Sequence, residues 1–149
     1  MENADINKNI YESWREITPE QVEQWLSQEN ISKRETRTFA GFEIVDSLDG
    51  RQNPLVEVSL VRLLKEGQYP QHIHDKSDAY FIISKGKAIF LSGQDKSEMV
   101  EGDRKEIPRG TPHGFEISDG QTFEFISLQS PPIKDEHTGD EDFRLVDRI

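Results

Sequence analysis

Short apolar runs separated by turn residues dominate the chain from Thr36 onward. The runs are rich in β-branched and aromatic residues and have no helices between them, which is typical of an all-β sandwich or barrel. The predicted strands lie within TFAGFEIV, LVEVSLVRLL, AYFIIS, KAIFLS, HGFEI and TFEFISLQ, with a further short strand in FRLV. The predicted turns between them include KEGQYP, SKG, SGQDKS, EGD and PRG.

The segment ITPEQVEQWL, which precedes the strands, has the pattern of a helix start. Thr18 is a suitable N-cap, and Pro19 at the first helical position has the backbone angle that a helix needs. Val22, Trp25 and Leu26 then follow at the spacing of one apolar helix face. We expect this face to pack onto the sheet.

The change of pattern divides the chain into an expected helical extension, residues 1–35, and an expected barrel, residues 36–149. Tyr11 and Trp14 are expected to belong to an earlier helical turn. Together with Trp25, they offer apolar area that a second copy of the chain can bury, so we expect a homodimer. The alternative is that these aromatic residues cover the chain's own barrel.

Composition narrows the range of partners. The chain has 149 residues, of which 18 are basic and 29 acidic, and its net charge of −11 argues against nucleic acid and anionic membranes as partners. It has no cysteine, which excludes disulfides and thiolate metal sites. No apolar run approaches the roughly 20 residues of a membrane span, and MENADINKNI lacks the pattern of a secretory signal. We expect a cytoplasmic protein whose partner is a small molecule.

Two of the four histidines, His72 and His74, lie one residue apart in the segment QHIHDKSDAYFIISKG. On an extended chain, side chains at i and i+2 point to the same side, so both imidazoles can bind one ion or line one cavity. Gly67 precedes the pair and Gly86 follows it, at the ends of the surrounding predicted elements.

A second cluster follows in GDRKEIPRGTPHGFEI, which contains Gly102, Pro108, Gly110 and His113 in this order. Together, the two clusters resemble the motifs of the cupin superfamily, G-x5-H-x-H-x3-4-E-x6-G and G-x5-P-x-G-x2-H-x3-N. The first motif has one residue fewer before its histidines, and the second matches as far as His113. The resemblance covers roughly residues 38–130 and implies a cupin, or jelly-roll, barrel of two antiparallel sheets with a short N-terminal helical extension.

The chain departs from the cupin motifs at two positions. The six residues that the motif places between its glutamate and its last glycine, Gly86 here, put Ala79 where the family has its glutamate, while the shorter spacing after His74 would place Asp78 there. Asp78 is expected to be at most a weak or indirect partner of a metal, and otherwise a surface carboxylate at the start of a strand. Ile117 stands where the family usually has asparagine. His137, in an acidic segment outside both motifs, is expected to be a surface residue.

The resemblance implies one divalent transition metal held by His72, His74 and His113, with open positions for water or substrate. Three neutral imidazoles suit Fe, Ni, Zn, Cu or Mn. Because imidazole must be neutral to bind a metal, we expect binding to weaken as the pH falls toward and below about 6. The alternative is a metal-free barrel that keeps its histidines for packing or hydrogen bonding.

Other residues are weaker candidates for the site. Tyr80, Phe81 and Phe115 can line a pocket, although aromatic residues on strands usually belong to the core. Arg62, on an apolar strand, either binds an anionic ligand inside the barrel or extends to solvent at an edge; we favour the edge. Arg109 is expected on an exposed turn.

Two classes of function fit this sequence. The first is a metalloenzyme acting on a small polar molecule: the three-histidine set resembles the iron sites of some cupin dioxygenases, and the segments ISLQS and GDEDFRLVDR faintly resemble the end of cupin-type sugar-phosphate isomerases. An isomerase would need an inward general base such as Asp78, Glu57 or Tyr80. The second is a non-catalytic barrel that binds a small ligand, with or without a metal, because one fold hosts many functions.

Overall fold

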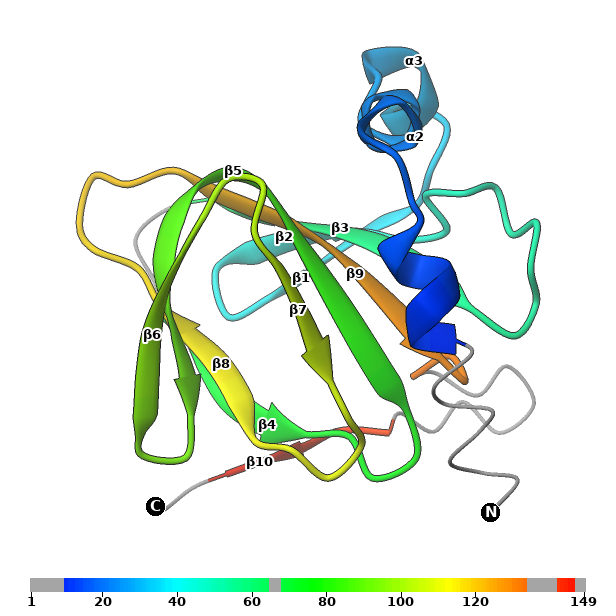
Figure 1. The fold of residues 1–149 in the computed structure, drawn as a ribbon. Coiled ribbons are helices and arrows are strands. Elements are labelled where there is room, and N and C mark those ends of the chain that lie inside the picture. Colours follow the sequence, from blue (N-terminus) through cyan, green and yellow to red (C-terminus); the bar gives the residue numbers. More distant parts are fainter. Residues whose placement is uncertain (1–9, 65–67, 134–141, 147–149) are drawn as a thin grey trace.

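The computed structural model describes residues 10–64, 68–133 and 142–146, which form three short helical segments and a curled antiparallel sheet (Figure 1). Residues 10–15 are helical, followed by α2 (Pro19–Trp25) and α3 (Gln28–Ile31). The strands are β1 (Thr36–Phe39), β2 (Phe42–Val45), β3 (Glu57–Leu63), β4 (Gln68–Ile73), β5 (Asp78–Ser92), β6 (Asp95–Val100), β7 (Arg104–Ile107), β8 (His113–Glu116), β9 (Phe123–Ser130) and β10 (Arg144–Leu145).

The strands form two antiparallel sheets that share the long strand β5. The first half of β5 pairs with β9 and β7, and this sheet continues through β3 and β2 to β1. The second half of β5 pairs with β6 and β8, and that sheet continues through β4 to β10. The predicted all-β barrel of two antiparallel sheets is therefore confirmed.

A bulge at Ser84, just before Gly86, lets β5 serve both sheets. The sequence pattern predicted a turn at SKG between two strands, and this prediction was wrong because the strand continues through it. The pairing with β9 shifts register after Ile83, and Gly86 adopts a positive φ of 78°. Phe81 before the shift and Phe90 after it both belong to the inner core, although they lie an odd number of residues apart. The extra residue at the bulge thus allows Phe81 and Phe90 to point to the same side of the strand, toward the core.

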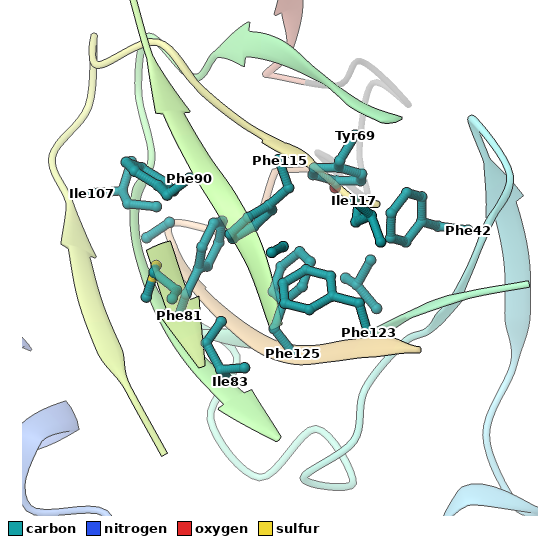
Figure 2. Close-up of a cluster of buried hydrophobic side chains, with 14 of the residues drawn as sticks. Phe42, Tyr69, Phe81, Ile83, Phe90, Ile107, Phe115, Ile117, Phe123 and Phe125 are labelled. Atoms are coloured by element: carbon teal, nitrogen blue, oxygen red, sulfur yellow. The ribbon is translucent and has the colours of Figure 1, made fainter. Parts of the chain in front are cut away.

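Aromatic side chains fill the space between the two sheets (Figure 2). Phe42, Phe115, Phe123 and Phe125 have almost no exposed surface, and they come from three different strands, β2, β8 and β9. The ring of Phe115 lies 4.8 Å from that of Phe123 and 5.0 Å from that of Phe125, measured between centroids. This inner core occupies one end of the barrel and leaves the other end to polar side chains.

The strands β4, β6 and β7 were not predicted from the sequence. β6 and β7 are short and mostly charged, so they lack apolar alternation. β4 contains Pro70, which suggested a turn, but the proline lies at a bulge between Tyr69 and His72, where a missing N–H is tolerated. The same bulge brings His72 to the inner side of the sheet that Tyr69 also faces.

Residues 10–15 lie over the outer face of the first sheet, and apolar side chains of α2 and α3 pack against the same buried cluster (Figure 1). The predicted N-cap is confirmed, because the Thr18 hydroxyl accepts a hydrogen bond from the backbone N–H of Gln21 at 3.1 Å. Tyr11 and Trp14 are buried, and the ring of Trp14 lies 6.0 Å from that of Tyr80. Tyr11 and Trp14 therefore cover the chain's own barrel. No helix in the described part of the chain has the length and apolarity that a membrane crossing requires.

Candidate metal centre

Three histidines meet at the polar end of the barrel. His72 on β4 is the direct cross-strand partner of His113 on β8, and His74 follows the end of β4. The ring centroids lie 4.2 Å apart for His72 and His113, 4.9 Å for His72 and His74, and 5.1 Å for His74 and His113. One nitrogen of each ring lies within 4.8 Å of one nitrogen of each other ring, so the three residues can hold one metal ion.

Each of the three rings is fixed by a backbone carbonyl. The Nδ1 atom of His72 lies 2.8 Å from the carbonyl oxygen of Pro70. The Nδ1 atom of His74 lies 2.5 Å from that of Asp142, and the Nδ1 atom of His113 lies 2.9 Å from that of Thr111. A carbonyl only accepts, so each Nδ1 carries the proton and each Nε2 keeps its lone pair for a metal. Nε2 of His113 is buried and has no partner among the described residues. Such an atom is costly unless a ligand occupies it, so the residues present fit a metal.

Burial keeps the imidazoles neutral. The three side chains are between 1% and 5% exposed. Burial lowers the pKa of His72 to about 4 and also lowers the pKa values of His74 and His113, because a charged imidazolium loses its hydration inside the barrel. Neutral imidazole is the metal-binding form, so the site should stay competent at a lower pH than the value near 6 expected from the sequence.

The lowered pKa values predict an acid-sensitive metal-free fold. Below a pH of about 6.5, His72 becomes protonated in the unfolded chain, whereas in the folded chain it stays neutral until the pH nears 4. The free energy of unfolding therefore decreases as the pH falls through this range. The shift in the pKa of His72 corresponds to a decrease of about 3 kcal/mol in the free energy of unfolding between pH 7 and pH 4. Urea unfolding of metal-free protein across this range measures it. His72→Gln should show a smaller loss, and equal losses in both proteins would contradict the assignment.

Residues 142–146 close one side of the site. The carboxylate of Asp142 accepts hydrogen bonds from the backbone N–H groups of residues 75–77 at 2.7–2.8 Å, while its carbonyl holds His74. Phe143 stacks on His72 with ring centroids 4.7 Å apart. The sequence predicted a strand in FRLV, which β10 confirms, but gave no local signal that Asp142 and Phe143 belong to the site, because they lie far from the histidines along the chain.

Asp78 and Ala79 face opposite sides of β5. Ala79 packs in the inner core, as expected for the position of the family's glutamate. Asp78 does not join the histidines, and it is not a surface carboxylate either, because it is 1% exposed. Its carboxylate accepts hydrogen bonds from the backbone N–H and the guanidinium of Arg109, both at 2.9 Å. Arg109 is thus on a turn as expected, half exposed, but paired with a buried acid.

The Asp78–Arg109 ion pair joins the two histidine-bearing segments. Arg109 lies in the turn that leads into His113, and the next residue, Gly110, donates its N–H to the carbonyl of His74 at 2.8 Å. The turn before one histidine is therefore tied both to the segment carrying another and to the start of β5. Asp78 therefore helps to hold the turn before His113 in place, although it is not one of the three histidines of the site.

A cavity of about 70 Å³ opens beside the histidines. Its aromatic walls include Tyr69, Phe81 and Phe143, and the ring of Phe81 lies 5.7 Å from that of His113. Ser127 and Gln129 on β9 form part of a polar wall.

That polar wall continues through Ser59 on β3 to Arg37 on β1. The hydroxyl of Ser59 donates to Asp46, whose carboxylate also pairs with the guanidinium of Arg37 at 2.9 Å. Among the residues that the structure describes, no carboxylate side chain lines the cavity.

Several predicted candidates lie elsewhere. Phe115 belongs to the core, and Tyr80 faces the helices on the outer side. Glu57 accepts a hydrogen bond from the N–H of Ser47, and burial raises its pKa, but it does not line the cavity. Arg62 pairs with Glu43 on the neighbouring strand, which agrees with the edge interpretation. His137 lies outside the described residues.

Comparison with known proteins identifies the fold. No protein-family profile matches the chain, and no curated protein sequence does. Among solved structures, Pac13 of Streptomyces, described as a nucleoside dehydratase, has a TM-score of 0.60 and 17% identity over 78% of this chain and 87% of that chain. The polyketide cyclase RemF from Streptomyces resistomycificus has a TM-score of 0.60 and 20% identity, over 80% and 84% of the two chains.

A third similar structure is an uncharacterised protein with a double-stranded β-helix domain from Klebsiella pneumoniae. Its TM-score is 0.60 and its identity 15%, over 79% of this chain and 95% of that chain. The chain therefore has the double-stranded β-helix, or cupin, fold, as the two histidine motifs predicted. At these identities the likeness extends to the fold alone.

Proposed function

We propose that His72, His74 and His113 hold one divalent transition metal, and that the chain is an enzyme acting on a small molecule in the adjoining cavity. The observation that carries this proposal is the convergence of three buried imidazoles whose Nδ1 atoms are all held by carbonyls. When bound, Fe, Ni, Zn, Cu or Mn would supply Lewis acidity at an oxygen of the substrate, and Fe or Cu also redox chemistry. The enzymes Pac13 and RemF share the fold, which is consistent with catalysis.

The residues of the cavity favour a dioxygenase-like site over an isomerase-like one. An isomerase needs a general base facing the substrate. Asp78 and Tyr80 face away from the cavity, and Glu57 does not line it. Burial raises the pKa of Tyr69 to about 12, so this phenol stays protonated and can donate a hydrogen bond but not remove a proton. The aromatic walls would bind and orient the substrate and exclude water.

The alternative proposal is a non-catalytic barrel that binds a small ligand. The absence of a carboxylate from the described cavity lining favours it, because the cavity then offers no acid–base pair. Turnover of any bound molecule by metal-loaded protein would separate the two functions. Binding without turnover across candidate ligands would favour the non-catalytic barrel.

Metal titration tests the site itself. Metal-free protein incubated with Fe²⁺, Mn²⁺, Ni²⁺, Cu²⁺ or Zn²⁺ and then dialysed should retain one ion per chain for at least one of these metals, measured by elemental mass spectrometry. The variant His72→Ala/His74→Ala should retain none, since one imidazole cannot hold the ion alone. Ser59→Ala/Ser127→Ala changes the same cavity without removing an imidazole, and should retain full occupancy. Equal occupancy in the histidine variant and wild type would overturn the proposal.

We also propose a homodimer, as expected from the sequence. Burial of Tyr11 and Trp14 on the chain's own sheet removes part of the original argument, but Leu55 and Leu64 remain exposed, at 69% and 55%. Light scattering at micromolar concentration should give about twice the chain mass of 17.2 kDa. A particle of the single-chain mass would contradict the dimer. The cytoplasmic location remains a prediction from the sequence.

A further inference from the structure

A second hollow lies between α2, α3 and the loop of residues 46–56 that joins β2 to β3, on the side of the sheet where the helices lie (Figure 1). Its volume of about 570 Å³ is within the range of small-molecule sites, roughly 300–1,000 Å³. It shares no lining residue with the cavity beside the histidines. A ligand bound in this hollow therefore need not touch the proposed metal.

The loop that forms one wall of the hollow has an unusual backbone. Ser47 and Arg51 adopt positive φ angles of 54° and 60°, although neither is glycine. Such a conformation is unfavourable for a residue with a Cβ atom, and it occurs most often at ligand-binding and catalytic sites. The loop is fixed against the helices by Asn30, whose side-chain amide donates to the carbonyl oxygens of Trp25 at 2.8 Å and Leu48 at 2.9 Å. The wall is thus held in place without a ligand.

Arg34 brings an unused hydrogen-bond donor to the lining of the hollow. Its Nη2 atom donates to Oδ1 of Asn30, whereas its Nε atom is buried and has no partner among the described residues. In the same part of the chain, no carboxylate pairs with Arg34. A buried N–H group without an acceptor is unfavourable, so this position favours a ligand that brings an oxygen atom.

The lining offers both donors and acceptors and has no net charge. Lys33 and Arg34 are basic, Glu29 and Asp49 are acidic, and Lys33 pairs with Glu29 at 3.6 Å. Most of the remaining lining consists of neutral amides: Gln21, Gln24, Asn30, Gln52 and Asn53. An amide group both donates and accepts, as does a hydroxyl group, whereas an anionic oxygen only accepts. The lining therefore matches an uncharged ligand with several hydroxyl groups.

A planar aromatic ligand fits this lining less well. Trp25 is the single aromatic residue among those that line the hollow, and it packs partly against the buried cluster between the helices and the sheet. An aromatic ligand gains most from aromatic neighbours that stack on its ring or meet it edge to face. One indole ring instead suits the small C–H face of a sugar ring, with the amides left to bind its hydroxyl groups.

We propose that this hollow is a binding site for a neutral sugar, either a monosaccharide or one unit of a longer saccharide. A hydroxyl or ring oxygen of the sugar accepts a hydrogen bond from Nε of Arg34. Gln24 on α2 and Gln52 on the loop exchange hydrogen bonds with hydroxyl groups from opposite walls, and the C–H face of the sugar packs on Trp25. The proposal does not depend on the metal site, because the two spaces share no lining residue.

Isothermal titration of the wild-type protein with D-glucose, D-galactose, D-mannose, maltose and cellobiose tests the proposal. At least one of these sugars should bind with a Kd of about 1 mM or lower. Binding of none of them would overturn the proposal. Uridine and adenosine test the aromatic class of ligand, and tighter binding of either nucleoside than of every sugar at this hollow would also overturn it.

Glutamine variants locate the bound sugar. Gln24→Ala/Gln52→Ala removes two exposed amides of the lining and should weaken sugar binding at least tenfold. Gln28→Ala/Gln68→Ala removes two exposed glutamines outside the lining and should bind the sugar as wild type does. Equal affinities in the two variants would contradict the proposal. Because all four side chains are exposed, both variants should fold, which circular dichroism checks.

The variant His72→Ala/His74→Ala separates this site from the proposed metal centre. It should bind the sugar with the affinity of wild type, whether or not the histidines hold a metal. Loss of sugar binding in this variant, together with full binding in Gln24→Ala/Gln52→Ala, would place the sugar in the barrel and overturn the proposal.

Discussion

Replacing Gly86 with alanine is expected to destabilise the protein by at least about 4 kcal/mol, a loss near the upper end for single substitutions. Two costs add up at this position. The positive φ of 78° is unfavourable for any residue with a Cβ atom, and the new Cβ would lie 1.8 Å from the carbonyl oxygen of Thr122. That oxygen belongs to the backbone, so the clash cannot be relieved by a rotamer change. Separation of β5 from β9 would disrupt both sheets.

Gly120 provides the matched control for this substitution. Its φ of 79° is nearly the same, but a Cβ there would meet nothing within 4 Å. Gly120→Ala should therefore cost only about 1 kcal/mol, the penalty of the left-handed conformation. Urea unfolding of both variants measures the difference. Similar losses at the two positions would show that the close approach of Thr122 is not what requires glycine at Gly86.

Replacing Arg109 with alanine is expected to cost about 3 kcal/mol, because it leaves the charge of Asp78 buried without its partner. The carboxylate of Asp78 is 1% exposed, whereas the guanidinium of Arg109 is half exposed, so the estimate stays at the lower end for broken buried pairs. The melting temperature should fall by roughly 10 °C. The same variant should bind the metal less tightly, since the turn leading to His113 loses its attachment to β5.

Two further variants decide whether the buried charge causes this loss. Asp78→Ala/Arg109→Ala removes both partners and should be more stable than Arg109→Ala alone, because no uncompensated charge remains. Arg144→Ala breaks the exposed pair with Asp75, in which both side chains are more than half exposed, and should leave the stability of the protein nearly unchanged. A double variant no more stable than Arg109→Ala would show that packing, and not charge, explains the loss.

The sequence predicted the fold class and each histidine motif because both are encoded locally. Alternating apolar residues mark the central strands, and the glycine and proline positions fix the turns around each histidine motif. Ala79 could also be assigned to the inner face by counting residues back from Gly86, and the structure agrees. The resemblance to cupins joined the two motifs, which periodicity alone does not do.

What the sequence did not predict depends on contacts between distant residues. The partner of Asp78 is 31 residues away, so its burial opposite Arg109 leaves no local trace. The bulges near Pro70 and Gly86 were interpreted as turns, because proline and glycine end strands more often than they bend them. The charged strands β6 and β7 are held by pairing with β5 and not by an apolar face, so their composition resembles that of loops.

The attachment of His74 to Asp142 also sets an order of events during synthesis. Asp142 follows His74 by 68 residues, and at about 5–20 residues per second the ribosome needs several seconds to add it. Until then His72, His74 and His113 lack the carbonyl that orients one ring and the phenyl ring that covers another. A metal ion that arrived early would meet an unfinished site, so stable loading of the proposed metal would have to follow the emergence of residues 142–146 from the ribosome.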